Sequence, residues 1–209
     1  MESHNKVQWV YASKNTSQLS QRYDQWATNY DVNLEKDFAW EAPQRAVEYV
    51  LKHVPSSANI LDAGAGTGLV GNLLSQHGYK NLTAIDISQG MLDIAADKGI
   101  YRDLRVMTLG DHLSFPSDQF DAVTCVGVLT VGHAPVQSLY ELVRVTKPGG
   151  HVIFSMRPDV YETAGFKETQ ASLESQNKWY LKEVGPRFFG MPKGEPDVLM
   201  QIWVYQIPS

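Results

Sequence analysis

An apolar segment followed by an acidic residue and three glycines at alternate positions constrains this chain more than any other feature. Residues 59–63 are predicted to form a short buried strand, because the run is too short and too tightly bounded for a helix. Gly64, Gly66 and Gly68 then form a tight turn that lets the backbone approach a ligand without interference from Cβ atoms. Apolar residues with helical spacing follow, so the pattern predicts a nucleotide-type site at the carboxyl end of a parallel strand.

Asp62 bears on which nucleotide such a turn would bind. The segment from Gly66 to Gly71 also matches the dinucleotide pattern G-x-G-x-x-G, which is weak by itself. A dinucleotide presents a negative pyrophosphate to the turn, and the Asp62 carboxylate would repel it. S-adenosylmethionine (SAM) carries an ammonium and a sulfonium, both of which a carboxylate favours. The pattern therefore indicates SAM rather than NAD, and a purely structural glycine turn is the alternative.

The composition suits one α/β domain. The chain has 209 residues, of which 43% are hydrophobic, and a formal net charge of −5. That charge provides no general attraction to nucleic acids or anionic membranes, although it does not exclude RNA bound through a local patch. Cys125 is the only cysteine, so no intrachain disulfide is possible and a cytoplasmic location is expected. The sequence shows neither a signal peptide nor an apolar run long enough to span a membrane.

The N-terminal region contains an aromatic stripe. Residues 1–15 carry few signals and are expected to be partly loose, whereas Tyr23, Trp26, Ala27 and Tyr30 have the spacing of one helix face. Such a stripe indicates either core packing or a lid helix that closes over the cofactor. We expect a single domain with three parts: a helical cap or lid over 1–55, a cofactor-binding core over 56–157, and a C-terminal helix and strand hairpin over 158–209.

Alternating strands and helices are predicted along the rest of the chain. The pattern predicts a stop and turn at 147–150, a helix beginning at 134–135, and a long connection over 185–197. Further strands are expected at 82–87, 104–108, 120–126, 151–156, 179–184 and 199–206, with a helix within 166–178. This order predicts a doubly wound α/β fold, with helices on both faces of a mostly parallel sheet and a late antiparallel strand.

Two acidic residues follow later strands of the predicted sheet. Asp86 ends the second strand, where ribose hydroxyls bind in such folds. Ile87 and Met91 could flank an adenine ring, although both are equally suited to a core. Asp111, next to Gly110, could accept a hydrogen bond from the adenine amino group or could simply belong to a turn.

Four blocks in a fixed order make the chain resemble the class I SAM-dependent methyltransferases. They are Leu61–Gly68, Ala84–Ser88, Gly110–Asp111, and Phe120–Val123 together with Lys147–Gly150. Within that superfamily the chain looks most like the methyltransferase-like protein 27 group, the Williams–Beuren-region methyltransferase-like proteins. Three segments carry that closer resemblance: Tyr23–Asp31, Ala42–Pro43 and Gly127–His133.

The resemblance implies a seven-stranded sheet, SAM as cofactor and an undefined methyl acceptor. It places the three glycines beside the methionine part of SAM, Asp86 on the ribose, Ile87 on the adenine and Asp111 at the adenine edge. The cofactor contacts expected overall are Tyr23, Trp26, Tyr30, Asp62, Ala63, Gly64, Gly66, Gly68, Asp86, Ile87, Met91, Gly110, Asp111, His112 and Val126.

Methyl transfer needs a general base only if the acceptor must lose a proton. His133 is the best candidate, because it follows the fourth strand on the side where the methyl group should point and titrates near neutrality. The alternative is that His133 begins a helix and contacts SAM or a neighbouring loop. His112 is a weaker candidate, and Cys125 alternates into the core. No His/Cys cluster has metal-ligand spacing, so no metal is expected.

Three classes of function remain open from the sequence. The first is a methyltransferase acting on a small molecule by in-line displacement. The second is a SAM-binding protein without transferase activity that acts through a partner. The third is a nicotinamide-dependent oxidoreductase, which Asp62 and the lack of a Tyr-x-x-x-Lys pair disfavour. The sequence gives no indication of oligomeric state.

Overall fold

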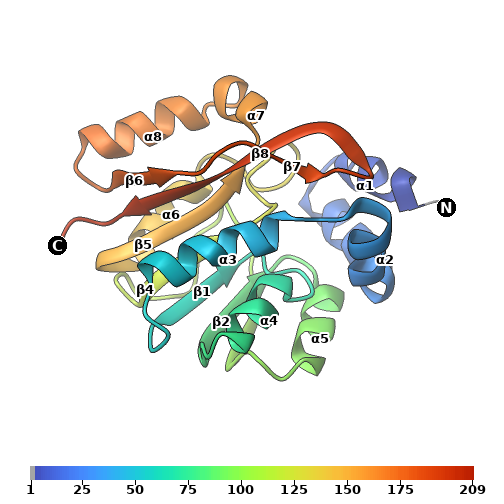
Figure 1. The fold of residues 1–209 in the computed structure, drawn as a ribbon, viewed down its shortest axis with the longest axis horizontal. Coiled ribbons are helices and arrows are strands. Elements are labelled where there is room, and N and C mark those ends of the chain that lie inside the picture. The colour runs from blue at the N-terminus through green and yellow to red at the C-terminus, as the bar shows by residue number, and fades with distance from the viewer. Residues whose placement is uncertain (1–2) are drawn as a thin grey trace.

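The structure, a computed structural model, describes residues 3–209, with side chains from residue 6 onward. Among these residues, seven strands lie side by side in the order β3-β2-β1-β4-β5-β8-β6, and β7 pairs only with β8 (Figure 1). The strands are β1 (Asn59–Ala63), β2 (Asn81–Asp86), β3 (Asp103–Val106), β4 (Phe120–Cys125), β5 (Thr146–Met156), β6 (Tyr180–Val184), β7 (Phe188–Met191) and β8 (Glu195–Gln206). β1 to β5 pair in parallel, while β8 is antiparallel to β5, which confirms the predicted fold class.

Helices cover both faces of the sheet, as the alternating pattern predicts. Apolar residues of α3 and α4 form one core cluster with the sheet, and those of α6 and α8 form another on the opposite face. The helices are α1 (Ser3–Tyr11), α2 (Thr16–Asn33), the π-helix η1 (Leu34–Phe38), α3 (Ala42–His53), α4 (Leu69–Gln76), α5 (Gln89–Asp97), α6 (Ser138–Val145), α7 (Pro158–Thr163) and α8 (Phe166–Ser175). Within the described residues, no helix combines the length and hydrophobicity needed to cross a bilayer.

Three local predictions in the second half of the chain were wrong. The stop predicted at 147–150 is confirmed, because α6 ends at Val145, but the segment is not a turn. It belongs to β5, which begins at Thr146, and the pairing with β4 shifts register between Phe120 and Ala122. The expected connection over 185–197 contains β7, which extends the sheet beside β8. The helix expected at 134–135 begins at Ser138, because a turn follows Pro135 first.

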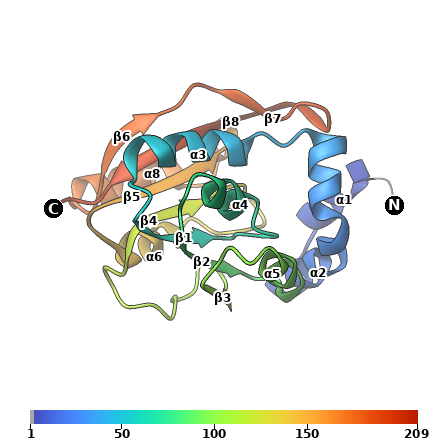
Figure 2. The ribbon, with the colours of Figure 1, turned by 60° about the horizontal axis from the view of Figure 1, so that its bottom comes forward.

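The N-terminal segment forms the helix α1 rather than a loose tail. Its apolar side chains, including Val7 and Val10, pack on α2 and η1 around the buried ring of Trp26. This cluster is separate from the two clusters that border the sheet. The helical cap, by which we mean α1, α2 and η1, stands at one end of the sheet (Figures 1 and 2).

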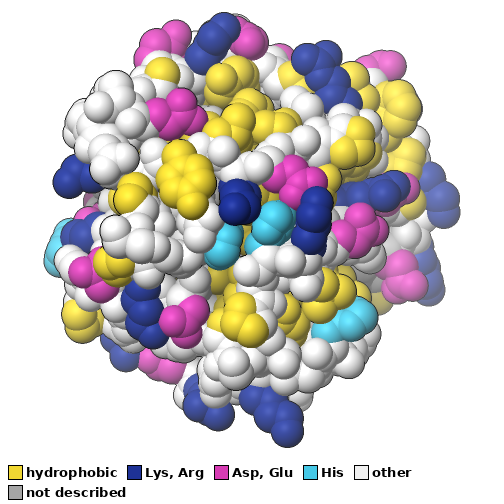
Figure 3. All heavy atoms as spheres, turned by 60° about the vertical axis from the view of Figure 1, so that its left-hand side comes forward, with side chains coloured by type: hydrophobic (Ala, Val, Ile, Leu, Met, Phe, Trp, Pro, Cys, Tyr) yellow, Lys and Arg dark blue, Asp and Glu magenta, His cyan; other side chains and the backbone are white. Residues whose placement is uncertain are grey.

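The surface carries charges of both signs. On the face shown in Figure 3, basic and acidic side chains are interspersed and two histidines lie side by side. This face therefore has no extended patch of one charge, the feature by which a nucleic-acid-binding surface is usually recognised.

Trp26→Ala should open the helical cap without unfolding the sheet. Trp26 is 3% exposed, and truncating a buried tryptophan costs about 3–5 kcal/mol. Because its cluster is separate from the sheet clusters, the loss should fall on the cap. Hydrogen exchange is expected to quicken at the amides of α2 and to stay unchanged in β1 and β4.

Val32→Ala provides the control, because Val32 lies on the same helix but is 51% exposed. An equal loss of protection in the cap and in the sheet would show that the cap is an integral part of one core.

Candidate functional site

The glycine turn after β1 adopts a backbone that only glycine tolerates well. Gly64, Gly66 and Gly68 have φ angles of +77°, +55° and +86°, in the left-handed region. A Cβ atom on Gly64 would lie 2.4 Å from Cγ2 of Val128. The turn is therefore packed closely against the loop that follows β4, and it leads directly into α4, as predicted.

The carboxylate of Asp86 holds this turn in place. One of its oxygens accepts the backbone N–H of Gly66 at 2.8 Å, and the other accepts that of Ser88 at 2.9 Å. Burial raises the pKa of Asp86, while these hydrogen bonds oppose that rise. Carboxylate oxygens have further lone pairs, so Asp86 can also accept hydrogen bonds from a ligand.

Asp62 lies beneath the turn rather than facing a ligand. Its carboxylate is 2% exposed and accepts hydrogen bonds from the hydroxyls of Tyr101 at 2.6 Å and Thr124 at 3.1 Å. Burial raises its pKa to about 6, against the opposing effect of these donors. Asp62 is thus mostly ionised at neutral pH. A buried carboxylate below the turn favours a cationic ligand and disfavours a pyrophosphate.

A first cavity, the cofactor cavity, opens above the glycine turn. It encloses about 880 Å³ of empty space, part of it open to solvent. Its walls come from the cap, from the glycine turn and from the ends of β2, β3 and β4, which are the carboxyl ends of parallel strands. The expected site residues that line it are Tyr23, Tyr30, Gly64, Gly66, Asp86, Ile87, Met91, Val126 and His133.

Other expected site residues do not reach the wall of the cofactor cavity. Asp111 and His112 are exposed, and His112 pairs with Glu141 at 3.2 Å. The wall near the end of β3 is formed instead by residues 107–109. The remaining residues that do not line this cavity are Trp26, Asp62, Ala63, Gly68 and Gly110.

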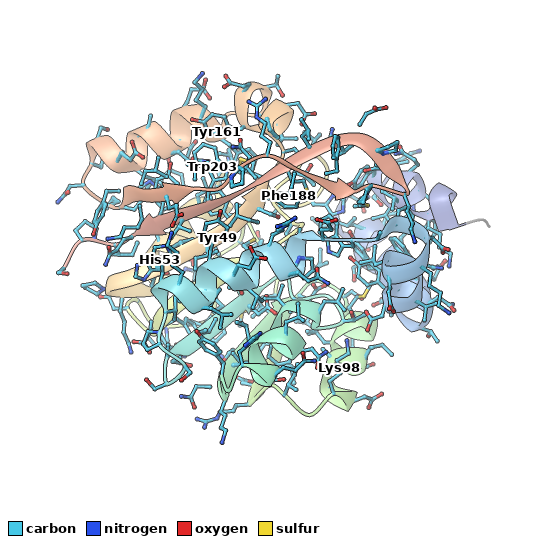
Figure 4. All side chains as sticks on the ribbon, in the orientation of Figure 1. Tyr49, His53, Lys98, Tyr161, Phe188 and Trp203 are labelled. Carbon is cyan, nitrogen blue, oxygen red and sulfur yellow. The ribbon has the colours of Figure 1, made fainter. Side chains whose placement is uncertain are left out.

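Helix α2 is fastened over the cavity by polar contacts with the loops beneath it. Asp24 accepts hydrogen bonds from the hydroxyl of Ser88 at 2.6 Å and from the N–H of Gly90 at 2.9 Å. Asp31 accepts a hydrogen bond from the hydroxyl of Thr67 and one from Lys98 at 2.7 Å, next to α5 (Figure 4). The cap is therefore held over the cofactor cavity by hydrogen bonds and an ion pair to the loops beneath it.

Tyr23 and His133 form a hydrogen-bonded pair at the cavity wall. The phenol oxygen lies 2.7 Å from Nε2 of His133. Burial lowers the pKa of His133 to about 4, although the carbonyl of Val131 partly opposes this. The ring is therefore neutral at pH 7, and in the tautomer that carries its proton on Nδ1, Nε2 accepts the hydrogen bond of the phenol. Nδ1 is buried and has no partner of normal hydrogen-bond geometry among the described side chains.

A second cavity adjoins the first and is covered by segments from both ends of the chain. It encloses about 760 Å³ of empty space, part of it open to solvent. α1 and α2 contribute wall residues from the N-terminal side, and β7 and β8 contribute them from the C-terminal side. Both cavities share the wall residues Tyr23, Tyr30, Trp40, Val126, Gly127 and Val128.

Sequence reasoning missed Trp40 and Tyr101. Trp40 lines both cavities and packs on Gly127, but its place before α3 gives no periodic signal. Tyr101, which holds Asp62, is indicated only by Gly71, since a Cβ there would lie 2.1 Å from the tyrosine hydroxyl. Gly71 is the last glycine of the G-x-G-x-x-G pattern, and the room that this hydroxyl needs explains why a glycine stands there.

Comparison with known proteins identifies a methyltransferase domain. Residues 61–154 match the methyltransferase domain family. The chain is therefore related to SAM-dependent methyltransferases, as the sequence predicted, and SAM is the cofactor of such enzymes.

Among its relatives is human methyltransferase-like protein 27, which is 39% identical over 155 residues; the match covers 71% of this chain and 62% of the human protein. The ubiquinone biosynthesis O-methyltransferase of Xylella fastidiosa is 29% identical, and the match covers 66% of this chain and 64% of that protein. The demethylmenaquinone methyltransferase of Tropheryma whipplei is 28% identical, and the match covers 91% of this chain and 76% of that protein. The chain thus spans slightly less than two thirds of the first two relatives.

Solved structures share the fold at low sequence identity. The cyclase SpnF superposes with a TM-score of 0.73 at 18% identity, covering 93% of this chain and 96% of that one. A SAM-dependent methyltransferase from Thermotoga maritima, possibly a histamine N-methyltransferase, superposes with a TM-score of 0.62 at 18% identity, covering 90% and 98%. At this identity the likeness concerns the fold alone.

Asp62→Asn should change how stability depends on pH. The folded protein holds the Asp62 proton up to a pKa of about 6, whereas the unfolded chain releases it near 3.8. Ionisation in the folded state therefore costs about 3 kcal/mol, and this cost appears as the pH rises from about 4 to 7. The free energy of unfolding of the wild type, relative to that of the variant, should fall by that amount in urea titrations. Parallel pH curves would contradict a buried, ionising Asp62.

Asp86→Asn should weaken SAM binding by about tenfold or more, because an amide nitrogen cannot accept the N–H of Gly66 or Ser88, nor a ligand hydroxyl. Calorimetry with SAM gives the affinity. Asp93→Asn is the matched control, since Asp93 is exposed on α5 and accepts a hydrogen bond only from Gln89 among the described residues. Equal affinity in the folded Asp86 variant would refute the role of this carboxylate.

Proposed function

We propose that this chain transfers the methyl group of SAM to a small organic molecule seated in the second cavity. The observation that carries the proposal is the shared wall, which brings the two cavities together at Tyr23, Trp40 and Val128. Two relatives are named for steps in making ubiquinone and menaquinone, which are small molecules. A donor and a small acceptor in adjoining cavities would meet at this shared wall.

SAM supplies an electrophilic methyl group and leaves as a neutral thioether. The chain's own contribution is to bind and orient the reactants and to exclude water. Asp86 and the glycine turn fix one partner, while α2 and Trp40 enclose the other. Orientation of this kind can supply about 7–11 kcal/mol of barrier reduction.

The Tyr23–His133 pair provides a route for a proton. An acceptor O–H or N–H next to Tyr23 would give its proton to the phenol oxygen as the phenol proton moves to Nε2 of His133. The charge then resides on the imidazolium, and no charge remains on the tyrosine. Burial raises the pKa of Tyr23 far above its usual range, so the phenol passes the proton on and does not become a phenolate.

A second candidate function is SAM binding without methyl transfer. The cyclase SpnF shares this fold, so the fold alone does not fix the reaction. A nicotinamide-dependent reaction is disfavoured by Asp62, whose charge beneath the turn would oppose a pyrophosphate there. Measuring the affinity for NADH tests whether the chain is an oxidoreductase. Measuring methyl-transfer turnover tests whether it binds SAM without transferring the methyl group.

The test is release of S-adenosylhomocysteine from SAM in the presence of a metabolite extract. Methyl transfer to a small molecule predicts release that depends on the low-molecular-mass fraction, together with NADH binding at least about tenfold weaker than SAM binding. Tight SAM binding with no release from any fraction would instead favour binding without transfer.

Tyr23→Phe extends the same assay to the proton route. Removal of the hydroxyl should slow turnover by about a hundredfold or more while the SAM affinity changes little. Tyr140→Phe, at a 47% exposed position on α6, is the control. Full activity in Tyr23→Phe would show that the acceptor needs no proton transfer to this pair.

A further inference from the structure

Aromatic and methionine side chains form much of the wall of the second cavity. Its walls include the side chains Tyr11, Trp26, Tyr30, Trp40, Met191 and Met200. The rings of Trp26 and Tyr30 meet edge to face with centroids 4.8 Å apart. Aromatic and methionine side chains bind planar apolar groups through dispersion and ring-edge contacts.

One polar group in this wall lacks a donor. Glu195, the first residue of β8, accepts a hydrogen bond from Gln8 of α1 at 3.0 Å through Oε1. Its other oxygen, Oε2, is buried and has no hydrogen-bond partner among the side chains that the structure describes. A buried carboxylate oxygen without a donor is costly, so the geometry favours a ligand that supplies one.

The neighbouring groups do not meet this need. Arg157 also lines the second cavity, but its guanidinium is bound by Asp159 through two hydrogen bonds of 2.7 and 3.0 Å. Burial and the nearby Glu195 carboxylate raise the pKa of Tyr11 to about 12, but its hydroxyl makes no hydrogen bond to Oε2 of Glu195. The charges of Asp159 and Glu195 both raise the pKa of Arg157, but no hydrogen bond joins Arg157 to Oε2 of Glu195, which is the one acidic residue in the described wall of the second cavity.

We infer that the acceptor is a small aromatic molecule with a hydrogen-bond donor, an amine or a hydroxyl, at the end that faces Glu195. This inference rests on the proposed function. Tyr23 lines both cavities, whereas Glu195 lines only the second and His133 only the first. The methyl-accepting atom therefore lies toward Tyr23, and the donor group lies at the other end of the ring.

The experiment compares four phenols that differ only at the group opposite the phenolic hydroxyl. They are para-ethylphenol, tyramine, tyrosol and para-hydroxyphenylpropionate, which carry an alkyl, an ammonium, a hydroxyl and a carboxylate group. Calorimetry measures their binding to the protein saturated with S-adenosylhomocysteine. Tyramine and tyrosol should bind about tenfold more tightly than para-ethylphenol, and the carboxylate probe should bind most weakly.

Glu195→Gln should reverse this order. In the variant, the amide oxygen takes the hydrogen bond from Gln8, and the amide NH2 then faces the cavity as a donor. The advantage of tyramine and tyrosol should disappear, and binding of the carboxylate probe should strengthen about tenfold. Glu162→Gln is the matched control, since Glu162 is exposed on α7 and pairs with Lys167.

Equal binding of all four phenols, tightest binding of the carboxylate probe, or binding of none of them overturns the inference. An unchanged order in Glu195→Gln overturns it as well. Affinity for S-adenosylhomocysteine is measured first in the wild type and in every variant, because intact affinity shows that the cofactor cavity is correctly folded. If the wild type does not bind S-adenosylhomocysteine, the result counts against the proposed function. If it binds S-adenosylhomocysteine but has equal affinity for all four phenols, the result counts against this inference alone.

Discussion

The whole site depends on the hydrogen bonds that the carboxylate of Asp86 accepts from the backbone of Gly66 and Ser88. Three glycines in left-handed conformations lose much conformational entropy when the turn is fixed, and the turn lacks side chains that could pack it. A charged acceptor at the end of β2 offsets that loss and ties the first two parallel strands together. Since the carboxylate also lines the cofactor cavity, the same group shapes the turn and faces the ligand.

Ser88 connects this turn with the roof of the cavity. Its N–H donates to Asp86, while its hydroxyl donates to Asp24 of α2 and also accepts the N–H of Met91 as the cap of α5. The position of α2 is therefore linked to the conformation of the turn through one small residue. Displacement of the roof would leave Ser88 and Gly90 without the Asp24 carboxylate, which water could replace at this partly exposed edge.

The sequence predicted the elements whose cause is local and missed those whose cause is tertiary. The strand, glycine turn and helix around Asp62, and the acid that ends β2, follow from periodicity and turn chemistry. α1 and β7 do not, because α1 is stabilised by its packing around Trp26 and β7 by its pairing with β8. Likewise, the hydrogen bond from Tyr101 to Asp62 joins residues 39 positions apart and leaves only Gly71 as a trace in the sequence.

The low basicity of His133 sets the order of events in the proposed reaction. A phenol has a pKa of about 10, whereas burial lowers that of His133 to about 4, so full deprotonation of the acceptor before attack would cost about 8 kcal/mol. Once the new bond to carbon begins to form, the attacking oxygen becomes strongly acidic and a weak base suffices. The proton would therefore move to Tyr23 and on to His133 during or after methyl transfer. A neutral, partly buried imidazole suits this late step, because it stays unprotonated across the physiological range and ready to accept.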